Sequence, residues 1–200
     1  MAMGIHGEIK ERIDRMADGE LFFTSDFLDI TTLTTARKCL GRLVNAGTIR
    51  RVLDGLYEKP RWNQLLGEPV PVNPEKVAYA LAHKYHWTIA PSSDVALNKL
   101  GLSTQVPVVW TYVSDGPYRE FSWGNIIVRF RHKTNREISL MSPITILVME
   151  ALRTLGREHV DDEVIHILKN RIPEKEKQTV RREAAGVTSW MYDVIREVCA

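Results

Sequence analysis

The sequence predicts an α+β protein whose helices and short strands occupy separate stretches of the chain. Three observations indicate this class. Apolar residues recur at helical spacing over roughly the first 46 positions, an Asp-Gly hairpin turn follows at once, and strand-like runs between 106 and 133 precede a purely helical remainder. With 200 residues, of which 44% are hydrophobic, the chain is long enough to bury a sizeable core.

Two helices are expected before residue 30. The first, at about 4–17, has an apolar face at helical spacing. The residues of that face are Ile5, Ile9, Ile13 and Met16. The second helix is short, includes Phe27 and Leu28, and is capped by Thr24 or Ser25, because a hydroxyl oxygen can accept a hydrogen bond from a first-turn amide.

A third helix is expected over 32–46, with Thr31 or Thr32 as its cap and an end at Asn45 to Gly47. One face is apolar and faces the core; it consists of Leu33, Ala36, Leu40, Leu43 and Val44. The opposite face is polar and carries Thr34, Thr35, Lys38, Arg42 and Asn45, with Arg37 at its margin.

A β-hairpin follows this helix directly. Its strands are expected at 48–53 and 56–59, joined by Asp54-Gly55, because Asp-Gly supplies the positive φ angles of a type I′ turn. The register that this turn implies pairs Leu53 with Leu56, Val52 with Tyr57, and Arg51 with Glu58. Three helices followed by a two-stranded ribbon form a winged helix-turn-helix, which we assign to residues 1–62.

A proline-rich linker, 63–73, is expected before a second, α+β domain at 74–200. This domain should contain a small antiparallel sheet and C-terminal helices. After a short strand in "HWTIA", the strands are expected in "VPVVWTYVS", "YREFSW" and "NIIVRFRHK", which form a meander with turns at Asp115-Gly116-Pro117 and Gly124-Asn125. The helices are expected at 74–85, from Ser92 or Ser93 to Leu100, and at roughly 143–155, 160–169, 174–185 and 188–198.

Positive charge is concentrated around the third helix and the hairpin. Residues 1–30 contain three Lys/Arg against seven Asp/Glu, a net −4, whereas residues 31–62 contain seven against two, a net +5. A DNA duplex presents closely spaced phosphates, and its major groove admits one α-helix. The sequence therefore predicts that the third helix and the hairpin bind double-stranded DNA.

Each residue of this surface has an expected role. Thr34, Thr35, Lys38 and Arg42 should contact bases or nearby phosphates, because the first turns of the recognition helix meet the base edges. Arg37 should reach a phosphate from the flank, and Arg50 and Arg51 should lie over the adjacent backbone or minor groove. Two alternatives remain: the charged face is simply solvated, or the winged helix docks on another protein.

A second basic surface is possible in the other domain. It would consist of Arg129, Arg131, Lys133 and Arg136. Because Arg129 and Arg131 alternate with apolar residues, they share one face of a strand. The surface would bind nucleic acid or a partner; the alternative is a solvated sheet face.

No motif predicts catalysis, a metal site or a cofactor. The pairs His83 with His86 and His159 with His166 lack a nearby Cys or an H-E-x-x-H context. Phosphate-loop and nucleophile-elbow motifs are also missing from the sequence. We therefore expect a protein that is not an enzyme; a nucleic-acid enzyme with an unrecognised active site in the second domain is the weaker alternative.

The compartment is expected to be the cytoplasm. Cys39 and Cys199 imply no disulfide framework, and Cys39 borders the apolar face of the third helix as a small hydrophobic residue. The charged N-terminus is no signal peptide, and no apolar run approaches the ~20 residues that span a bilayer, so no membrane partner is expected.

Several stretches together resemble the AbiEi-type antitoxins of type IV toxin–antitoxin systems, in particular a compact branch of about 200 residues of unknown function. In the first domain they are "FFTSDFLDI" and "LGRLVNAGTIRRVLDGLYEKP". In the second they are "LLGEPVPVNPEKVAYALA", "IAPSSDVALNKLGLSTQVP", "VSDGPYREF" and "ITILVMEALRTLG". "LGLSTQVP" followed closely by "SDGP" is the most specific of these motifs.

The resemblance implies a phage-defence transcriptional regulator that represses its own operon. Its partners would be an operator with repeated sites and a nucleotidyltransferase-like toxin, which such antitoxins oppose without a stable complex. The second domain would supply the antitoxin function or protein contacts.

Overall fold

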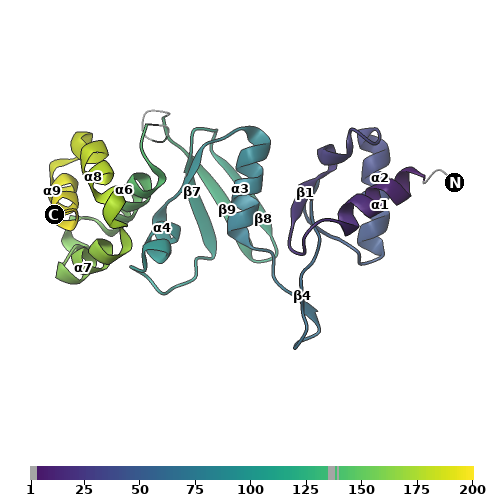
Figure 1. Cartoon of the computed structure of the whole chain (residues 1–200), viewed down its shortest axis with the longest axis horizontal. Coiled ribbons are helices and arrows are strands. Elements are labelled where there is room, and N and C mark those ends of the chain that lie inside the picture. The colour runs from purple at the N-terminus through teal and green to yellow at the C-terminus, as the bar shows by residue number, and fades with distance from the viewer. Residues whose placement is uncertain (1–3, 135–137, 139) are drawn as a thin grey trace. The chain divides into compact units, whose positions relative to one another are not determined.

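The computed structural model describes residues 4–134, 138 and 140–200. The chain divides into two compact units, Met1–Ala80 and Leu81–Ala200, and helix α3 (Pro74–Tyr85) runs across this division. Helices and small sheets alternate in the first unit, and four helices gather at the C-terminal end of the second (Figure 1). The predicted α+β class is confirmed.

Up to residue 60, the described part of the first unit contains two α-helices, a 3-10 helix and a three-stranded sheet. Its elements are α1 (Ile5–Asp14), β1 (Leu21–Phe23), the 3-10 helix η1 (Thr24–Phe27), α2 (Leu33–Asn45), β2 (Arg50–Leu53) and β3 (Leu56–Glu58). The sheet is antiparallel, with the strand order β1-β3-β2. Sequence patterns do not predict β1, because three residues are too short for a period-2 signal.

The core of this unit forms where the helices meet the sheet. It consists of Ile9, Ile13, Phe22, Phe27, Ala36, Cys39, Leu40, Leu43, Ile49 and Tyr57. The buried position predicted for Cys39 is therefore confirmed. Leu33 was expected in the core but is 40% exposed, because it is the first residue of α2 and precedes the turn that packs.

Of the N-caps expected for η1 and α2, the one for α2 is confirmed. Thr32 is the N-cap of α2 and accepts a hydrogen bond from the Thr35 amide at 3.4 Å. At η1, however, the expected cap at Thr24 or Ser25 is wrong, since Phe23 holds the N-cap position and its amide donates to the Asp26 carboxylate at 2.8 Å. β1 runs directly into η1, so the helix begins one residue earlier.

The hairpin of β2 and β3 has the expected turn but a different register. Leu53 does pair with Leu56 across Asp54-Gly55. The pairs expected for Val52 and Arg51 are wrong, because a bulge lies between Arg51 and Leu53. Arg51 therefore faces Tyr57, and Arg50 faces Glu58. A bulge adds one residue to one strand and so shifts every later pair by one.

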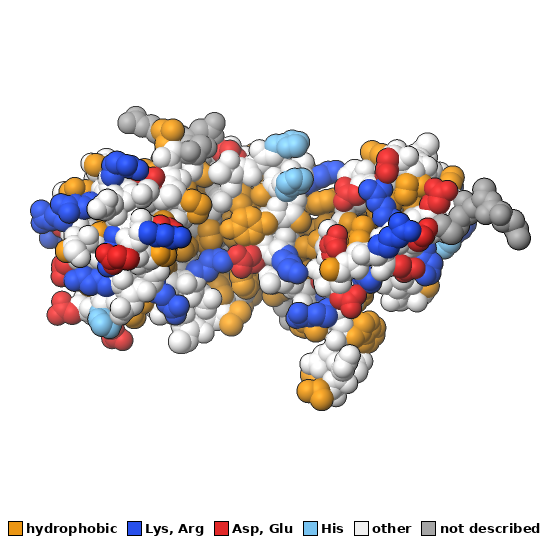
Figure 2. Space-filling view, in the orientation of Figure 1, with side chains coloured by type: hydrophobic (Ala, Val, Ile, Leu, Met, Phe, Trp, Pro, Cys, Tyr) orange, Lys and Arg blue, Asp and Glu red, His pale blue; other side chains and the backbone are white. Residues whose placement is uncertain are grey.

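The segment expected as a linker contains a second, two-stranded hairpin. Its strands are β4 (Trp62–Asn63) and β5 (Glu68–Pro69). The turn between them is apolar and exposed: Leu65 is 96% and Leu66 71% exposed. Figure 2 shows hydrophobic side chains, in orange, at the tip of the hairpin that Figure 1 labels β4.

The second unit contains a four-stranded sheet of order β6-β7-β9-β8. Its strands are β6 (Ile89–Pro91), β7 (Val109–Ser114), β8 (Arg119–Trp123) and β9 (Ile126–His132). β6 pairs with β7, and β8 with β9, in antiparallel fashion, as expected for the Gly124-Asn125 hairpin. β7 and β9 pair in parallel, however, so the expected meander is wrong.

Burial explains this strand order. β7 ends in four consecutive buried residues, whereas β8 is exposed at three of its five positions. The most buried long strand, β7, takes a central position, and the polar strand β8 takes an edge, which limits unwanted pairing there. The chain after β7 consequently crosses over instead of turning back.

Helices cover this sheet and form a cluster of their own. They are α4 (Ser93–Leu100), α6 (Pro143–Leu155), α7 (Asp162–Arg171), α8 (Glu174–Glu183) and α9 (Ser189–Val198), with the 3-10 helices η2 (Arg157–His159) and η3 (Ala184–Gly186) between them. The expected bounds of the four C-terminal helices are confirmed within about two residues. Within the described residues, no helix is long and apolar enough to cross a membrane.

Candidate nucleic-acid interface

The candidate interface is built on α2, whose two faces differ sharply. Ala36, Leu40 and Leu43 are at most 3% exposed and fix the helix against the core. Because these apolar residues recur every three or four positions and form one face of the helix, the residues on the opposite face must point outward. This amphipathic pattern is what orients the polar side chains of α2.

Three cations on the outward side of α2 lie in solvent. Arg37, Lys38 and Arg42 are all exposed. In the part of the chain that the structure describes, none of the three has an ion pair or a side-chain hydrogen bond to a neighbour. Their charges are therefore available to an anionic partner, in contrast to those of α1, where Lys10 contacts Asp14 and Arg15 contacts Glu11.

The two threonines at the start of α2 differ from each other. Thr34 is exposed. Thr35 is half-buried, and its hydroxyl oxygen lies 3.1 Å from that of Thr32, the cap residue. Thr34 thus makes no side-chain hydrogen bond with the described residues, while Thr35 stabilises the helix start.

A groove of about 280 Å³ separates α2 from the β2–β3 hairpin. Its lining residues are Arg37, Gly41, Val44, Asn45, Arg51, Asp54, Gly55 and Tyr57. Arg37 comes from the helix and Arg51 from the hairpin, so a cation lines each side. Gly41 and Gly55 contribute no side chain, which keeps the groove open to a backbone or a phosphate.

The two hairpin arginines have different surroundings. Arg51 is exposed, and its polar interactions with described residues are with the Asp54 carboxylate and the Leu53 carbonyl, within its own hairpin. Arg50 donates to the carboxylate of Glu58, which is 4% exposed, and to the Val70 carbonyl. Arg50 therefore compensates a buried charge inside the unit, whereas Arg51 is exposed to solvent.

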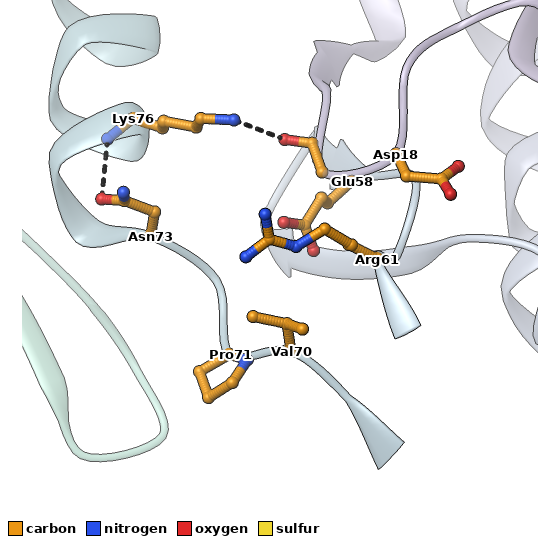
Figure 3. Close-up of a pocket in the computed structure, with 8 residues that line it drawn as sticks. Asp18, Glu58, Arg61, Val70, Pro71, Asn73 and Lys76 are labelled. Atoms are coloured by element: carbon orange, nitrogen blue, oxygen red, sulfur yellow. Dashed lines mark hydrogen bonds between the residues drawn. The ribbon is translucent and has the colours of Figure 1, made fainter. Parts of the chain in front are cut away.

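A small pocket of about 110 Å³ lies beside this ion pair (Figure 3). Its acidic residues are Asp18 and Glu58, and its basic residues are Arg61 and Lys76. The Lys76 ammonium donates to the Gly19 carbonyl at 3.4 Å. Both acidic residues are paired with cations outside the pocket lining, Glu58 with Arg50 and Asp18 with Lys59.

The basic strand β9 does not form the continuous surface that alternation suggests. Arg129 donates to Glu120 on the neighbouring strand at 2.8 Å, and this hydrogen bond raises the pKa of the Arg129 guanidinium. Arg131 and Lys133 line a cavity with residues of α4 and α6. Arg136 lies outside the described residues.

The sequence patterns did not predict one buried polar cluster. Glu150 of α6 is 5% exposed and accepts a hydrogen bond from Ser92. Its signal in the sequence is a single carboxylate within the apolar run "ITILVMEAL". No group of three or more His, Cys, Asp or Glu side chains with the geometry of a metal site occurs among the described residues.

The comparison with known families assigns the chain to one of them. Residues 8–180 match the model described as "Family of unknown function (DUF6088)". Because the match spans most of the 200 residues, the chain belongs to this family. A search of curated proteins found no match.

Proposed function

We propose that residues 1–62 form a winged helix-turn-helix that binds double-stranded DNA. The order α1, β1, η1, α2, β2, β3 supports this proposal, because it places a short helix, a longer helix and a hairpin in the sequence that the motif requires. In this assignment α2 is the recognition helix and β2–β3 is the wing.

The observation that carries the proposal is the unpartnered cationic face of α2. Arg37, Lys38 and Arg42 are exposed and lack ion pairs with the described residues, and Arg51 lines the same groove as Arg37. Binding of exposed, unpaired cations to a duplex is favourable, because it releases the counterions that are condensed on the DNA. Thr34 and Lys38, in the first turns, are assigned to base edges, and Arg37, Arg42 and Arg51 to phosphates.

The wider role that we propose is sequence-specific transcriptional regulation in the cytoplasm. The motifs shared with AbiEi-type antitoxins support an autorepressing antitoxin whose partner is a nucleotidyltransferase-like toxin, without a stable complex. A single recognition helix reads few base pairs, so the operator should contain repeated sites. The proposal assigns no catalytic activity to the chain.

A gel-shift titration tests the DNA-binding proposal. Full-length protein is titrated against the DNA upstream of its own gene, at two salt concentrations and with a scrambled competitor. A specific shift that weakens steeply with salt supports the proposal, since phosphate contacts dominate such binding. A shift that the competitor removes equally well would refute sequence-specific binding.

The antitoxin role has its own test. The neighbouring gene is induced in a growing culture with and without this chain, and growth is recorded. Rescue of growth supports an antitoxin. Growth arrest that is identical in both cultures contradicts it, whatever the gel shift shows.

A protein-interaction module is the second candidate. The apolar tip of the β4–β5 hairpin favours it, because Leu65 and Leu66 are exposed and Trp62, beside them, is 56% exposed. Contiguous exposed apolar residues often mark contacts with other proteins. If no DNA binds, this function replaces the first.

A further inference from the structure

A second concave site lies in unit Leu81–Ala200, at the carboxyl ends of the parallel strands β7 and β9. The cavity measures about 340 Å³. Its lining residues are Ser92, Ser93, Val113, Arg131, His132, Lys133, Glu150, Arg153 and Thr154. Crevices at the carboxyl ends of parallel strands are frequent ligand sites in α/β sheets, because the chain leaves the sheet there in loops.

A buried carboxylate organises the floor of this cavity. Glu150 accepts hydrogen bonds from the Ser92 hydroxyl at 2.7 Å, from the Lys133 ammonium at 3.0 Å and from the Arg153 guanidinium. Burial alone would raise the pKa of the Glu150 carboxyl, but these hydrogen bonds outweigh burial, and the pKa is lowered. Glu150 is therefore a carboxylate at neutral pH and fixes the positions of two cations.

Positive charge predominates among the side chains that line the cavity. Arg131, Lys133 and Arg153 are cationic, whereas Glu150 is the one carboxylate in that set. Arg131 is exposed and takes part in no ion pair with the described residues. Its register opposite the buried Val113 places it on the same sheet face, next to the cavity.

The start of α4 adds hydrogen-bond donors to the same cavity. Ser92 is the N-cap residue, but its hydroxyl donates to Glu150 and makes no capping hydrogen bond. The first-turn amides of α4 thus lack the side-chain acceptor that an N-cap serine usually supplies. Such amides and nearby cations attract the same class of ligand, an anion.

We propose that this cavity binds a small phosphorylated molecule of nucleotide size, with Arg131 and Lys133 contacting its phosphate. Cationic side chains with several donors suit the oxygens of a phosphate group. A cavity of about 340 Å³ exceeds what a lone phosphate fills and falls in the range of small-molecule sites. A nucleic-acid backbone fits less well, because the neighbouring Arg129 is paired with Glu120 and the cations surround one cavity without forming a stripe.

Isothermal titration calorimetry on the full-length protein tests the proposal. The probes are ATP, AMP, inorganic phosphate and a single-stranded oligonucleotide, each titrated separately. We expect a nucleotide to bind with one-to-one stoichiometry and more tightly than inorganic phosphate. Equal affinities for phosphate and nucleotides would assign the site to free phosphate, and binding of the oligonucleotide alone, or of no probe, would overturn the proposal.

Two variants locate the binding. Arg131→Ala should weaken nucleotide binding about tenfold, which is the loss expected for one charge-assisted hydrogen bond. The control is Arg196→Ala, which removes the same charge from an exposed position of α9 that pairs with Asp193. Unchanged binding by Arg131→Ala, or an equal loss in the control, would contradict the assignment to this cavity. Because Arg131 is exposed, its removal should leave the fold intact, which a thermal melt verifies.

Discussion

The outward face of α2 and the strand β9 carry similar numbers of cations, but these cations differ in whether they form ion pairs. On α2, Arg37, Lys38 and Arg42 extend into solvent without ion-pair partners among the described residues. On β9 and just beyond it, Arg129 is paired with Glu120, and Lys133 with the buried Glu150. A basic run in a sequence therefore does not show which of its cations are unpaired, because carboxylates elsewhere in the chain pair with some of them.

Unpaired and paired cations also have different physical roles. Exposed, unpaired cations contribute little to the free energy of unfolding and are available for long-range attraction of a polyanion. Cations held by a buried carboxylate are fixed in position and stabilise the fold only as a set. Substitutions should therefore affect binding on α2 and stability around Glu150.

The largest effect is expected when Glu150 is removed. Glu150→Ala would remove the acceptor of three hydrogen bonds and leave the buried Ser92 hydroxyl without it, at a cost of about 3 kcal/mol in the free energy of unfolding. Glu120→Ala is the matched control, because its pair with Arg129 is at the surface and should contribute about 1 kcal/mol or less. Urea denaturation measures both. Equal decreases in the free energy of unfolding of the two variants would contradict the distinction between cations paired with a buried carboxylate and cations paired at the surface.

A smaller contrast is expected within the wing. Arg50→Ala would leave the Glu58 carboxylate, which is 4% exposed, without its cation, and should lower the free energy of unfolding by about 2–3 kcal/mol. Arg51→Ala should change it by no more than about 0.5 kcal/mol but weaken DNA binding severalfold. Urea titrations and gel shifts on both variants decide the matter. If Arg51→Ala is the less stable variant, the wing register is misassigned.

The smallest effect concerns acid stability. The pKa of Glu150 is lowered in the folded protein, because the hydrogen bonds from Ser92, Lys133 and Arg153 outweigh the opposing effect of burial. Its contribution is therefore present above the unfolded value of about 4.3 and is lost as the pH falls through the lower, folded pKa. Melts of the wild type between pH 7 and pH 3 should show this loss, and Glu150→Gln should show a shallower one. An identical acid dependence in both proteins would mean that Glu150 does not titrate as described.

Local patterns predicted the elements that carry the candidate interface. The 3.6-residue period of α2 separates its buried face from its cations, and Thr32 and Asp54-Gly55 mark a helix start and a turn through chemistry within a few residues. The roles of individual cations depend on distant partners. Ser92 and Glu150 are 58 residues apart, and neither the parallel pairing of β7 with β9 nor the bulge beside Val52 has a local signature. The sequence could thus indicate a basic helix and hairpin, but it could not show that Arg50 forms an ion pair with the buried Glu58.

The most direct measurement is the salt dependence of DNA binding by the wild type and by the double variant Lys38→Ala/Arg42→Ala. The control is Lys10→Ala/Arg15→Ala, which removes the same charge from α1 and its C-cap. Each phosphate contact contributes about 0.9 to the slope of log K against log salt concentration. If Lys38 and Arg42 both contact phosphates or adjacent bases, the α2 variant should bind its upstream DNA about 100-fold more weakly, with a slope shallower by up to about 2, while the α1 variant keeps the wild-type slope. Identical slopes and affinities for all three proteins would contradict the assignment of α2 as the DNA-binding helix.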